Sequence, residues 1–163
     1  MADLHEQLEK CLKGRFCLMG LGNTDFGDDG LGVILAERLE AAGLSDVILA
    51  GNMPERFIDT ATATAFDYLI FLDAVELGAP PGSVVFLDSG EMAAKFPQIS
   101  THKISLGLLA KLVEENGKTK ARLLGVQPES LKSGGELSQV VQETVDLLYK
   151  LILDIRKKVN SES

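Results

Sequence analysis

The chain has 163 residues, of which 45% are apolar and 25% are charged. This balance is typical of a soluble domain with a hydrophobic core, and the length fits one domain of about 150 residues over 1–163. The 16 basic and 24 acidic residues leave a net charge of −8, which disfavours binding to nucleic acid. No apolar run approaches the roughly 20 residues of a membrane span, and no signal-peptide core opens the chain. We therefore expect a cytoplasmic protein without membrane insertion.

Apolar runs of strand length alternate with stretches of helical periodicity along the chain. The first helix lies within residues 1–14 and precedes the first strand, so it is an addition to the alternating pattern. The charged segment 156–163 is expected to be a frayed end. The expected strands are residues 15–20, 46–50, 68–73, 83–87 and 121–126, and the expected helices cover residues 4–12, 31–42, 104–112 and 137–155, with one more beginning at Pro54.

Strands that are apolar on both faces and separated by helices indicate an α/β fold. We expect a twisted, mostly parallel five-stranded sheet sandwiched between helices in a single domain. The linker at residues 78–82 has only five residues. This is too short for a crossover helix, so the strand at 83–87 is predicted to run antiparallel.

The densest chemical signal is the glycine-rich segment at residues 20–32, GLGNTDFGDDGLG. A strand, a glycine-rich turn and a helix open many dinucleotide-binding folds, but the glycine spacing differs from G-x-G-x-x-G. Asp25, Asp28 and Asp29 would also repel a pyrophosphate, so we expect no nucleotide. Acidic residues at the start of a helix often serve only to interact favourably with the helix dipole. That interpretation does not explain why these acids cluster beside the end of a strand.

Two further polar residues are predicted to lie at the same edge of the sheet. Asp73 ends an apolar strand, and His102 precedes a predicted helix. Taken singly, Asp73 could be a turn cap and His102 a solvated loop residue. Taken with Asp29, they supply two carboxylates and an imidazole, which suit a borderline divalent metal that keeps open positions for water or substrate.

Covalent catalysis has little support in the sequence. No G-x-S-x-G motif is present, so a serine nucleophile on an elbow turn is disfavoured. Cys17 lies inside a predicted buried strand and Cys11 on the apolar face of the first helix, where thiols are usually inert.

The chain resembles the endopeptidases that mature the large subunit of [NiFe] hydrogenases, over roughly residues 15–155. The motifs that carry the resemblance are short, but they occur in the family's order and spacing. The segment MPE at 53–55 and the double acid at 28–29 resemble the hydrogenase 3 type most. The matching motifs are GLGN at 20–23, DDGLG at 28–32, FLDA at 71–74, PG at 81–82, TH at 101–102 and GVQP at 125–128.

The resemblance implies an endopeptidase that removes the C-terminal extension of a nickel-loaded large-subunit precursor. It implies that Asp29, Asp73 and His102 contact the metal and that the substrate supplies the nickel. From the glycine-rich and GVQP motifs we also expect substrate contacts at the residues Gly22, Asn23 and Gln127.

Two mechanisms and one alternative function remain open at this point. Nickel held by the three metal-contacting residues could polarise the scissile carbonyl and activate a water. Alternatively the three residues dock the metal, while Asp29 or Asp73 acts as general base. The alternative function is a non-catalytic chaperone that checks for nickel.

The sequence departs from the family pattern after the second strand. Many members carry an acidic Asp-Gly-Gly turn there, whereas residues 50–52 of this chain read AGN. Gly51 is expected to keep the tight turn, while Ala50 removes the acid and any role that the acid has in substrate binding.

Overall fold

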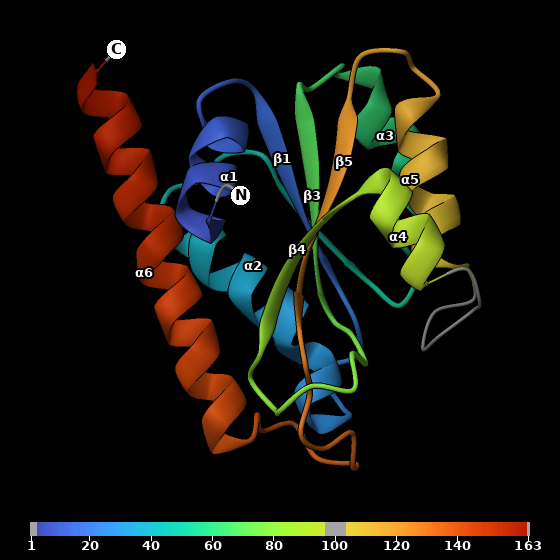
Figure 1. The fold of residues 1–163 in the computed structure, drawn as a ribbon, viewed down its shortest axis with the longest axis vertical. Coiled ribbons are helices and arrows are strands. Elements are labelled where there is room, and N and C mark those ends of the chain that lie inside the picture. Colours follow the sequence, from blue (N-terminus) through green and yellow to red (C-terminus); the bar gives the residue numbers. More distant parts are fainter. Residues whose placement is uncertain (1–2, 97–103, 163) are drawn as a thin grey trace.

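Five strands form one sheet in the order β2-β1-β3-β5-β4. Figure 1 shows β1, β3 and β5 side by side in its centre. The computed structural model describes residues 3–96 and 104–162 of the chain. Each predicted strand is present within one or two residues of its expected bounds. The strands are β1 (Phe16–Leu21), β2 (Val47–Gly51), β3 (Tyr68–Ala74), β4 (Val84–Asp88) and β5 (Lys120–Val126).

The sheet is parallel except for its edge strand β4. β1 pairs in parallel with β2 and β3, and β3 pairs in parallel with β5. β4 runs antiparallel to β5, with Phe86 opposite Leu124. The antiparallel direction predicted from the short linker is therefore confirmed, although β4 pairs with β5 and not with the preceding strand.

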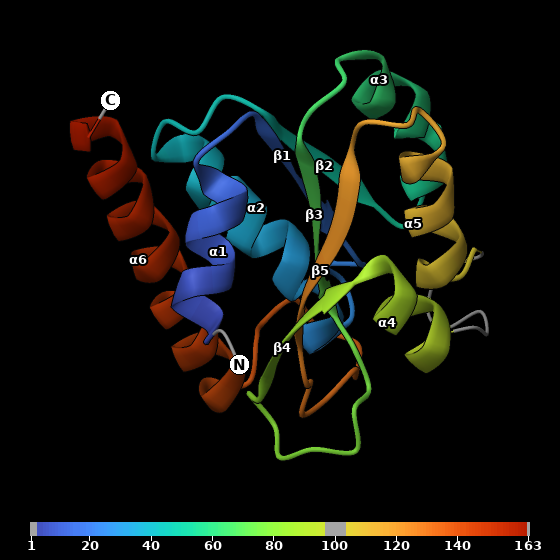
Figure 2. The ribbon, with the colours of Figure 1, turned by 45° about the horizontal axis from the view of Figure 1, so that its top comes forward.

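Helices cover both faces of the sheet, as Figures 1 and 2 show. α1 (Leu4–Leu12), α2 (Leu31–Ala41) and α6 (Gln139–Glu162) lie on one face, and α3 (Ile58–Ala63), α4 (Ser89–Lys95) and α5 (Leu106–Glu114) lie on the other. Each face has its own apolar cluster, because alternate residues of the buried strands point to opposite sides. Ile70 and Leu72 of β3 belong to the first cluster, and Leu69 and Phe71 to the second. The predicted α/β sandwich is confirmed.

α4 was not predicted from helical periodicity, and α5 lies two residues further along the chain than the predicted helix. α4 has seven residues and buries only Met92, so it has no apolar stripe to detect. Its sequence signal is instead a capping box, in which Asp88 and Glu91 exchange side-chain and backbone hydrogen bonds. The helix expected over residues 104–112 is α5, and within it Leu108 is 46% exposed although helical spacing of its apolar residues would bury it. The buried face consists of Leu106, Leu109, Ala110 and Val113.

The predicted frayed end at 156–163 is wrong for residues 156–162, because α6 continues as a helix to Glu162. Contacts with the N-terminal helix support this last part of α6. Arg156 donates to the carbonyl oxygen of Leu12 at 2.7 Å, and its guanidinium lies 5.0 Å from the ring centre of Phe16. Lys158 pairs with Glu9 at 3.0 Å. None of the described helices is long and apolar enough to cross a membrane.

The glycine-rich segment allows α2 to approach the sheet very closely. The 3₁₀ turn η1 (Gly27–Gly30) leads directly into α2 and packs against β3. A Cβ on Gly32 would lie 1.9 Å from the carbonyl oxygen of Leu72, which no side chain can do without moving the backbone. This contact holds the start of α2 against the end of β3.

We expect Gly32→Ala to lower the free energy of unfolding by about 3 kcal/mol or more, because the added methyl group must push α2 off β3. Gly90→Ala is the control, since a Cβ there meets nothing closer than 3.5 Å. That variant should change stability by no more than about 1 kcal/mol. Urea denaturation measures both, and equal stability of the two variants would contradict the close-approach interpretation.

Candidate active site at the carboxyl edge of the sheet

The two predicted catalytic carboxylates lie at the carboxyl edge of the sheet. Asp29 belongs to η1 and Asp73 is the penultimate residue of β3, against which η1 packs. Ligands of open α/β sheets bind at this edge. His102, the third predicted metal contact, lies outside the described residues, in the 97–103 segment between α4 and α5.

One oxygen of the Asp29 carboxylate is held and the other is not. The backbone N–H of Asn23 donates to Oδ2 of Asp29 at 2.8 Å. The side chain is only 5% exposed, and within residues 3–96 and 104–162 no donor reaches its buried Oδ1. Buried polar atoms are nearly always hydrogen-bonded, so this oxygen is suited to accept a proton or to contact a cation.

Gly22 and Asn23, predicted as substrate contacts, position Asp29 in the structure. Gly22 has a φ of +112°, and a Cβ there would lie 1.8 Å from the carbonyl oxygen of Asp29. The turn therefore needs glycine both for its conformation and for space. The N–H of Gly22 donates to Gly51 at 3.0 Å. Whether Gly22 or Asn23 also touches substrate stays a prediction.

Asp73 is almost completely buried, with 1% of its surface exposed. It lies opposite Gly125 in the register of β3 and β5. Residues 69 and 71 of the same strand contribute to the core under α3 and α5. By the alternation of a strand, Asp73 points to that same face. α4 and α5, which cover it, are the helices that residues 97–103 connect.

A small cavity of about 110 Å³ lies beside Asp29. Its apolar walls come from the chain after β3, the end of α4 and the chain after β5. Asp29 and Glu76 supply its carboxylates. The apolar lining includes Val75, Phe96, Pro128 and Leu131.

Asp28 anchors the segment after β5 that carries part of this cavity wall. Its carboxylate is fully buried and accepts backbone hydrogen bonds from Glu129 at 2.8 Å, Ser130 at 3.0 Å and Ser138 at 2.7 Å, with a fourth from the Ser138 hydroxyl at 2.8 Å. Burial acts to raise the pKa of Asp28, but these hydrogen bonds outweigh it and lower the pKa. The sequence interpretation of Asp28 as a favourable helix-start acid missed this role, because its partners lie about a hundred residues away.

Gln127, the third predicted substrate contact, uses its amide within the protein. Oε1 accepts from the backbone of Leu77 at 2.6 Å, and Nε2 donates to Glu76 at 3.0 Å and to the Pro128 carbonyl at 3.2 Å. These bonds tie the turn after β3 to the chain after β5. A direct contact with substrate stays a prediction, and the hydrogen bonds favour an indirect role.

The turn that departs from the family pattern keeps its geometry. Gly51 has a φ of +59° and accepts the hydrogen bond from Gly22, so the expected tight turn is confirmed. Ala50 is buried in the core. It carries no carboxylate, so this chain lacks the acidic group that the family pattern has at this position.

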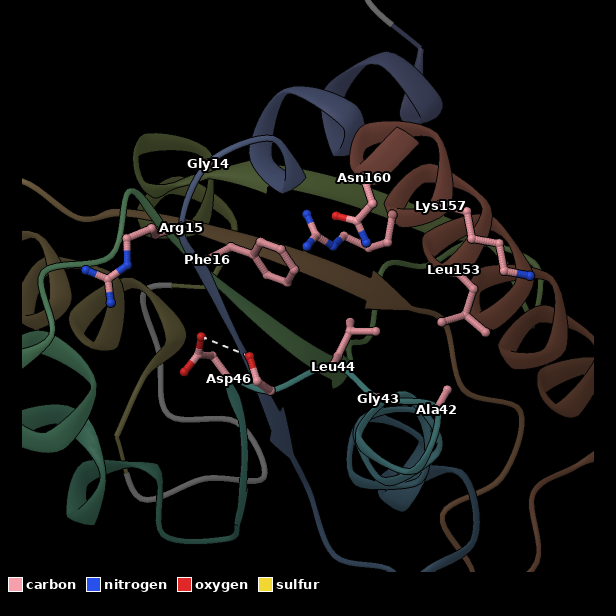
Figure 3. Close-up of a pocket in the computed structure, with 12 residues that line it drawn as sticks. Gly14, Arg15, Phe16, Ala42, Gly43, Leu44, Asp46, Leu153, Lys157 and Asn160 are labelled. Carbon is pink, nitrogen blue, oxygen red and sulfur yellow. Dashed lines mark hydrogen bonds between the residues drawn. The ribbon is translucent and has the colours of Figure 1, made fainter. Parts of the chain in front are cut away.

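A larger cavity of about 520 Å³ lies at the opposite edge of the sheet (Figure 3). It opens at the amino ends of β1 and β2, with Phe16, Leu44 and Leu153 around its centre. Its carboxylate, Asp46, pairs with the neighbouring Ser45 hydroxyl at 3.4 Å, and Arg156 is bonded to Leu12. This cavity lacks the carboxylate pair of the opposite edge.

The cysteines are structural. Burial raises the pKa of Cys11 to about 11 and that of Cys17 to about 12, so neither forms a thiolate at neutral pH. Among the described residues, no group of three or more His, Cys, Asp or Glu side chains gathers as a metal site. The predicted metal site includes His102, so it lies partly outside the described residues.

A family model described as hydrogenase maturation protease matches residues 33–155. The chain belongs to this family. The matched range includes Asp73 and His102 but begins after Asp29. The prediction that Asp29 belongs to the site is therefore supported by the glycine-rich motif and by the position of its carboxylate. The relatives are named proteases or hydrogenase formation proteins, and this chain is accordingly a peptidase of hydrogenase maturation, which favours the enzyme over the non-catalytic chaperone.

Individual relatives agree with this assignment. The hydrogenase 3 maturation protease of Escherichia coli is 31% identical over 136 residues, which cover 82% of this chain and 85% of that protein. The crystal structure of a [NiFe] hydrogenase maturation protease from Thermococcus kodakarensis has a TM-score of 0.80 at 31% identity and covers 93% of this chain and 99% of that one. The solution structure of an endopeptidase from Escherichia coli has a TM-score of 0.73 at 28% identity and covers 83% and 87%.

We expect Asp28→Asn to lower the free energy of unfolding by about 2 kcal/mol at pH 7, because the new amide group faces backbone donors. The lowered pKa means that Asp28 stabilises the protein above its unfolded pKa of about 3.9 and loses this effect as the pH falls through the folded pKa. The difference between wild type and variant should therefore shrink below about pH 4.

Urea denaturation between pH 3 and pH 7 measures this difference. Asp25→Asn is the control, because Asp25 is an exposed acid of the same turn, and it should stay within about 0.5 kcal/mol of wild type. If the difference in the free energy of unfolding between wild type and Asp28→Asn does not change with pH, the charge of Asp28 does not contribute to stability.

Proposed function

We propose that this protease removes the C-terminal extension of a [NiFe]-hydrogenase large-subunit precursor, in the cytoplasm, once nickel has been inserted. Asp29, Asp73 and His102 contact the nickel, which belongs to the substrate and is not a resident cofactor. The observation that carries the proposal is the buried Oδ1 of Asp29, which no donor reaches in the described part of the chain, beside a cavity at the carboxyl edge of the sheet.

The charge at this edge supports recognition of a cation. Asp29 and Asp73 are both buried acids, and carboxylate oxygens are acceptors that a cation can satisfy. Imidazole and carboxylate groups are common ligands of divalent first-row metals. A precursor without nickel would lack the group that these carboxylates bind, so nickel insertion would precede cleavage.

Hydrolysis requires a water to add to the scissile carbonyl carbon and its proton to pass to the leaving amine. We propose that Asp29 takes this proton through Oδ1, which makes the enzyme an aspartyl-type endopeptidase. The N–H of Asn23 fixes the other oxygen, so the carboxylate is oriented before substrate binds. A carboxylate oxygen has two lone pairs, so Oδ1 can contact the nickel with one and accept the proton with the other. If the nickel instead polarises the carbonyl, Asp29 serves as a metal contact only and takes no proton.

The metal dependence of the rate distinguishes these mechanisms. With precursor that has been loaded with nickel or with zinc, a carboxylate base predicts similar kcat values for the two metals. Carbonyl polarisation by the metal predicts a kcat that changes with the metal.

We expect Asp73→Asn to abolish cleavage of nickel-loaded precursor at near-normal thermal stability. The substitution keeps the shape but replaces a charged acceptor with an amide that can donate. Asp25→Asn is the matched control, since Asp25 belongs to the same edge but is exposed, and it should keep most activity. Equal activity of the two variants would remove Asp73 from the site, and unfolding of Asp73→Asn would favour a purely structural carboxylate.

We also expect the isolated protease to bind nickel weakly. Three protein ligands from separate segments leave coordination positions that only water can fill until the precursor arrives. Metal analysis after dialysis against a mild chelator should find much less than one nickel per chain. One nickel per chain that survives the chelator would contradict the assignment of the metal to the substrate.

A further inference from the structure

The small cavity beside Asp29 has the properties of a binding pocket for one apolar side chain. It holds about 110 Å³, which is room for a single side chain and not for a folded segment. Its lining is mostly apolar, with Val75, Phe96, Pro128 and Leu131 from three separate parts of the chain. Ligand pockets typically combine such walls with a few polar groups that orient the ligand, and here these are Asp29 and Glu76.

Leu131 is unusual among these residues because it is 45% exposed yet belongs to a firmly held segment. The backbone of Asp28 donates to Ser130 at 2.9 Å, next to Leu131, and Gly134 is bonded to both Gly27 and Asp25. The buried carboxylate of Asp28 adds its hydrogen bonds on the same segment. Hydrogen bonds within the protein thus fix the backbone on both sides of Leu131.

A second exposed apolar side chain lies on the neighbouring turn. Phe26 is also 45% exposed, and it pairs with Gly134 in an isolated bridge between the two segments. Exposed apolar side chains that form a contiguous patch often mark a binding surface, and this bridge brings together the segments that carry Phe26 and Leu131. Here they accompany the concave pocket that Asp29 lines.

We propose that this cavity is a specificity pocket for an apolar residue directly beside the scissile bond, with Leu131 setting its size. The proposal rests on the proposed function, because it takes the Asp29 carboxylate as the reacting edge. An extended substrate that presents its carbonyl to Asp29 places an adjacent side chain within reach of Val75 and Leu131. An acidic side chain would be repelled by the carboxylates of Asp29 and Glu76 and would lose its hydration against the apolar walls, so it is disfavoured.

The test uses nickel-loaded precursors in which each residue that flanks the scissile bond is varied in turn through Ala, Val, Leu, Met and Asp. For one of the two flanking positions, wild type should cleave the Leu and Met precursors at least tenfold faster than the Asp precursor in kcat/KM. A methylene group in an apolar pocket changes kcat/KM by roughly ten- to two-hundredfold.

Leu131→Trp should fill the pocket and lower kcat/KM for the Leu and Met precursors at least tenfold, with less than a threefold effect on the Ala precursor. Leu131→Ala should shift the preference toward the larger side chains. Leu147→Trp is the control, because Leu147 lies exposed on α6, and it should leave the whole series unchanged. Matching thermal stability of the Leu131 variants and wild type identifies the effect as local.

Two outcomes would overturn the pocket. In the first, the kcat/KM of wild type does not depend on the side chain at either flanking position. In the second, Leu131→Trp lowers kcat/KM equally for all precursors. A wild-type protein that cleaves none of the nickel-loaded precursors would instead overturn the proposed function. The two failures are distinguishable, because the pocket proposal can be overturned only when the wild-type enzyme cleaves the precursors.

Discussion

The site depends on the contact between the glycine-rich segment and the end of β3. Gly32 touches the carbonyl oxygen of Leu72, and Gly22 leaves room for the backbone of Asp29. Any larger side chain at either position would displace η1 from the sheet. Because the approach is so close, the Asn23 N–H donates to one oxygen of Asp29, and the carboxylate is fixed at the edge where β3 ends, next to Asp73.

The adjacent acids Asp28 and Asp29 differ in how many hydrogen bonds their carboxylates accept, and this difference indicates different roles. Asp28 accepts four hydrogen bonds and is fully satisfied inside the protein. Asp29 accepts one on Oδ2, and Oδ1 is not reached by a donor within the described residues. A satisfied buried carboxylate stabilises the fold, while a carboxylate with open acceptor capacity is available to bind or react. Asp28 thereby fixes the segment that carries part of the pocket wall, and Asp29 is the carboxylate that we propose to react.

The strands and the layer arrangement could be predicted from the sequence because apolar runs and periodicity report burial directly. Properties that depend on distant partners could not. The role of Asp28 requires Ser138 to lie beside it, and the helical end of α6 requires α1 beneath Arg156. α4 had a local signal in its capping box but no apolar stripe, so periodicity alone did not detect it. In the site, the motifs indicated Asp29 and Asp73, while the indirect role of Gln127 became visible only through its hydrogen bonds.

The central claim is that the carboxylates at this edge recognise the nickel of the precursor. The most direct measurement compares the affinity of wild type and Asp29→Asn for the same large-subunit precursor with and without nickel. Wild type should bind the nickel-loaded form at least tenfold more tightly, and Asp29→Asn should bind both forms with the affinity that wild type has for the nickel-free form. An Asp29→Asn protein that still prefers the nickel-loaded precursor tenfold would contradict the claim.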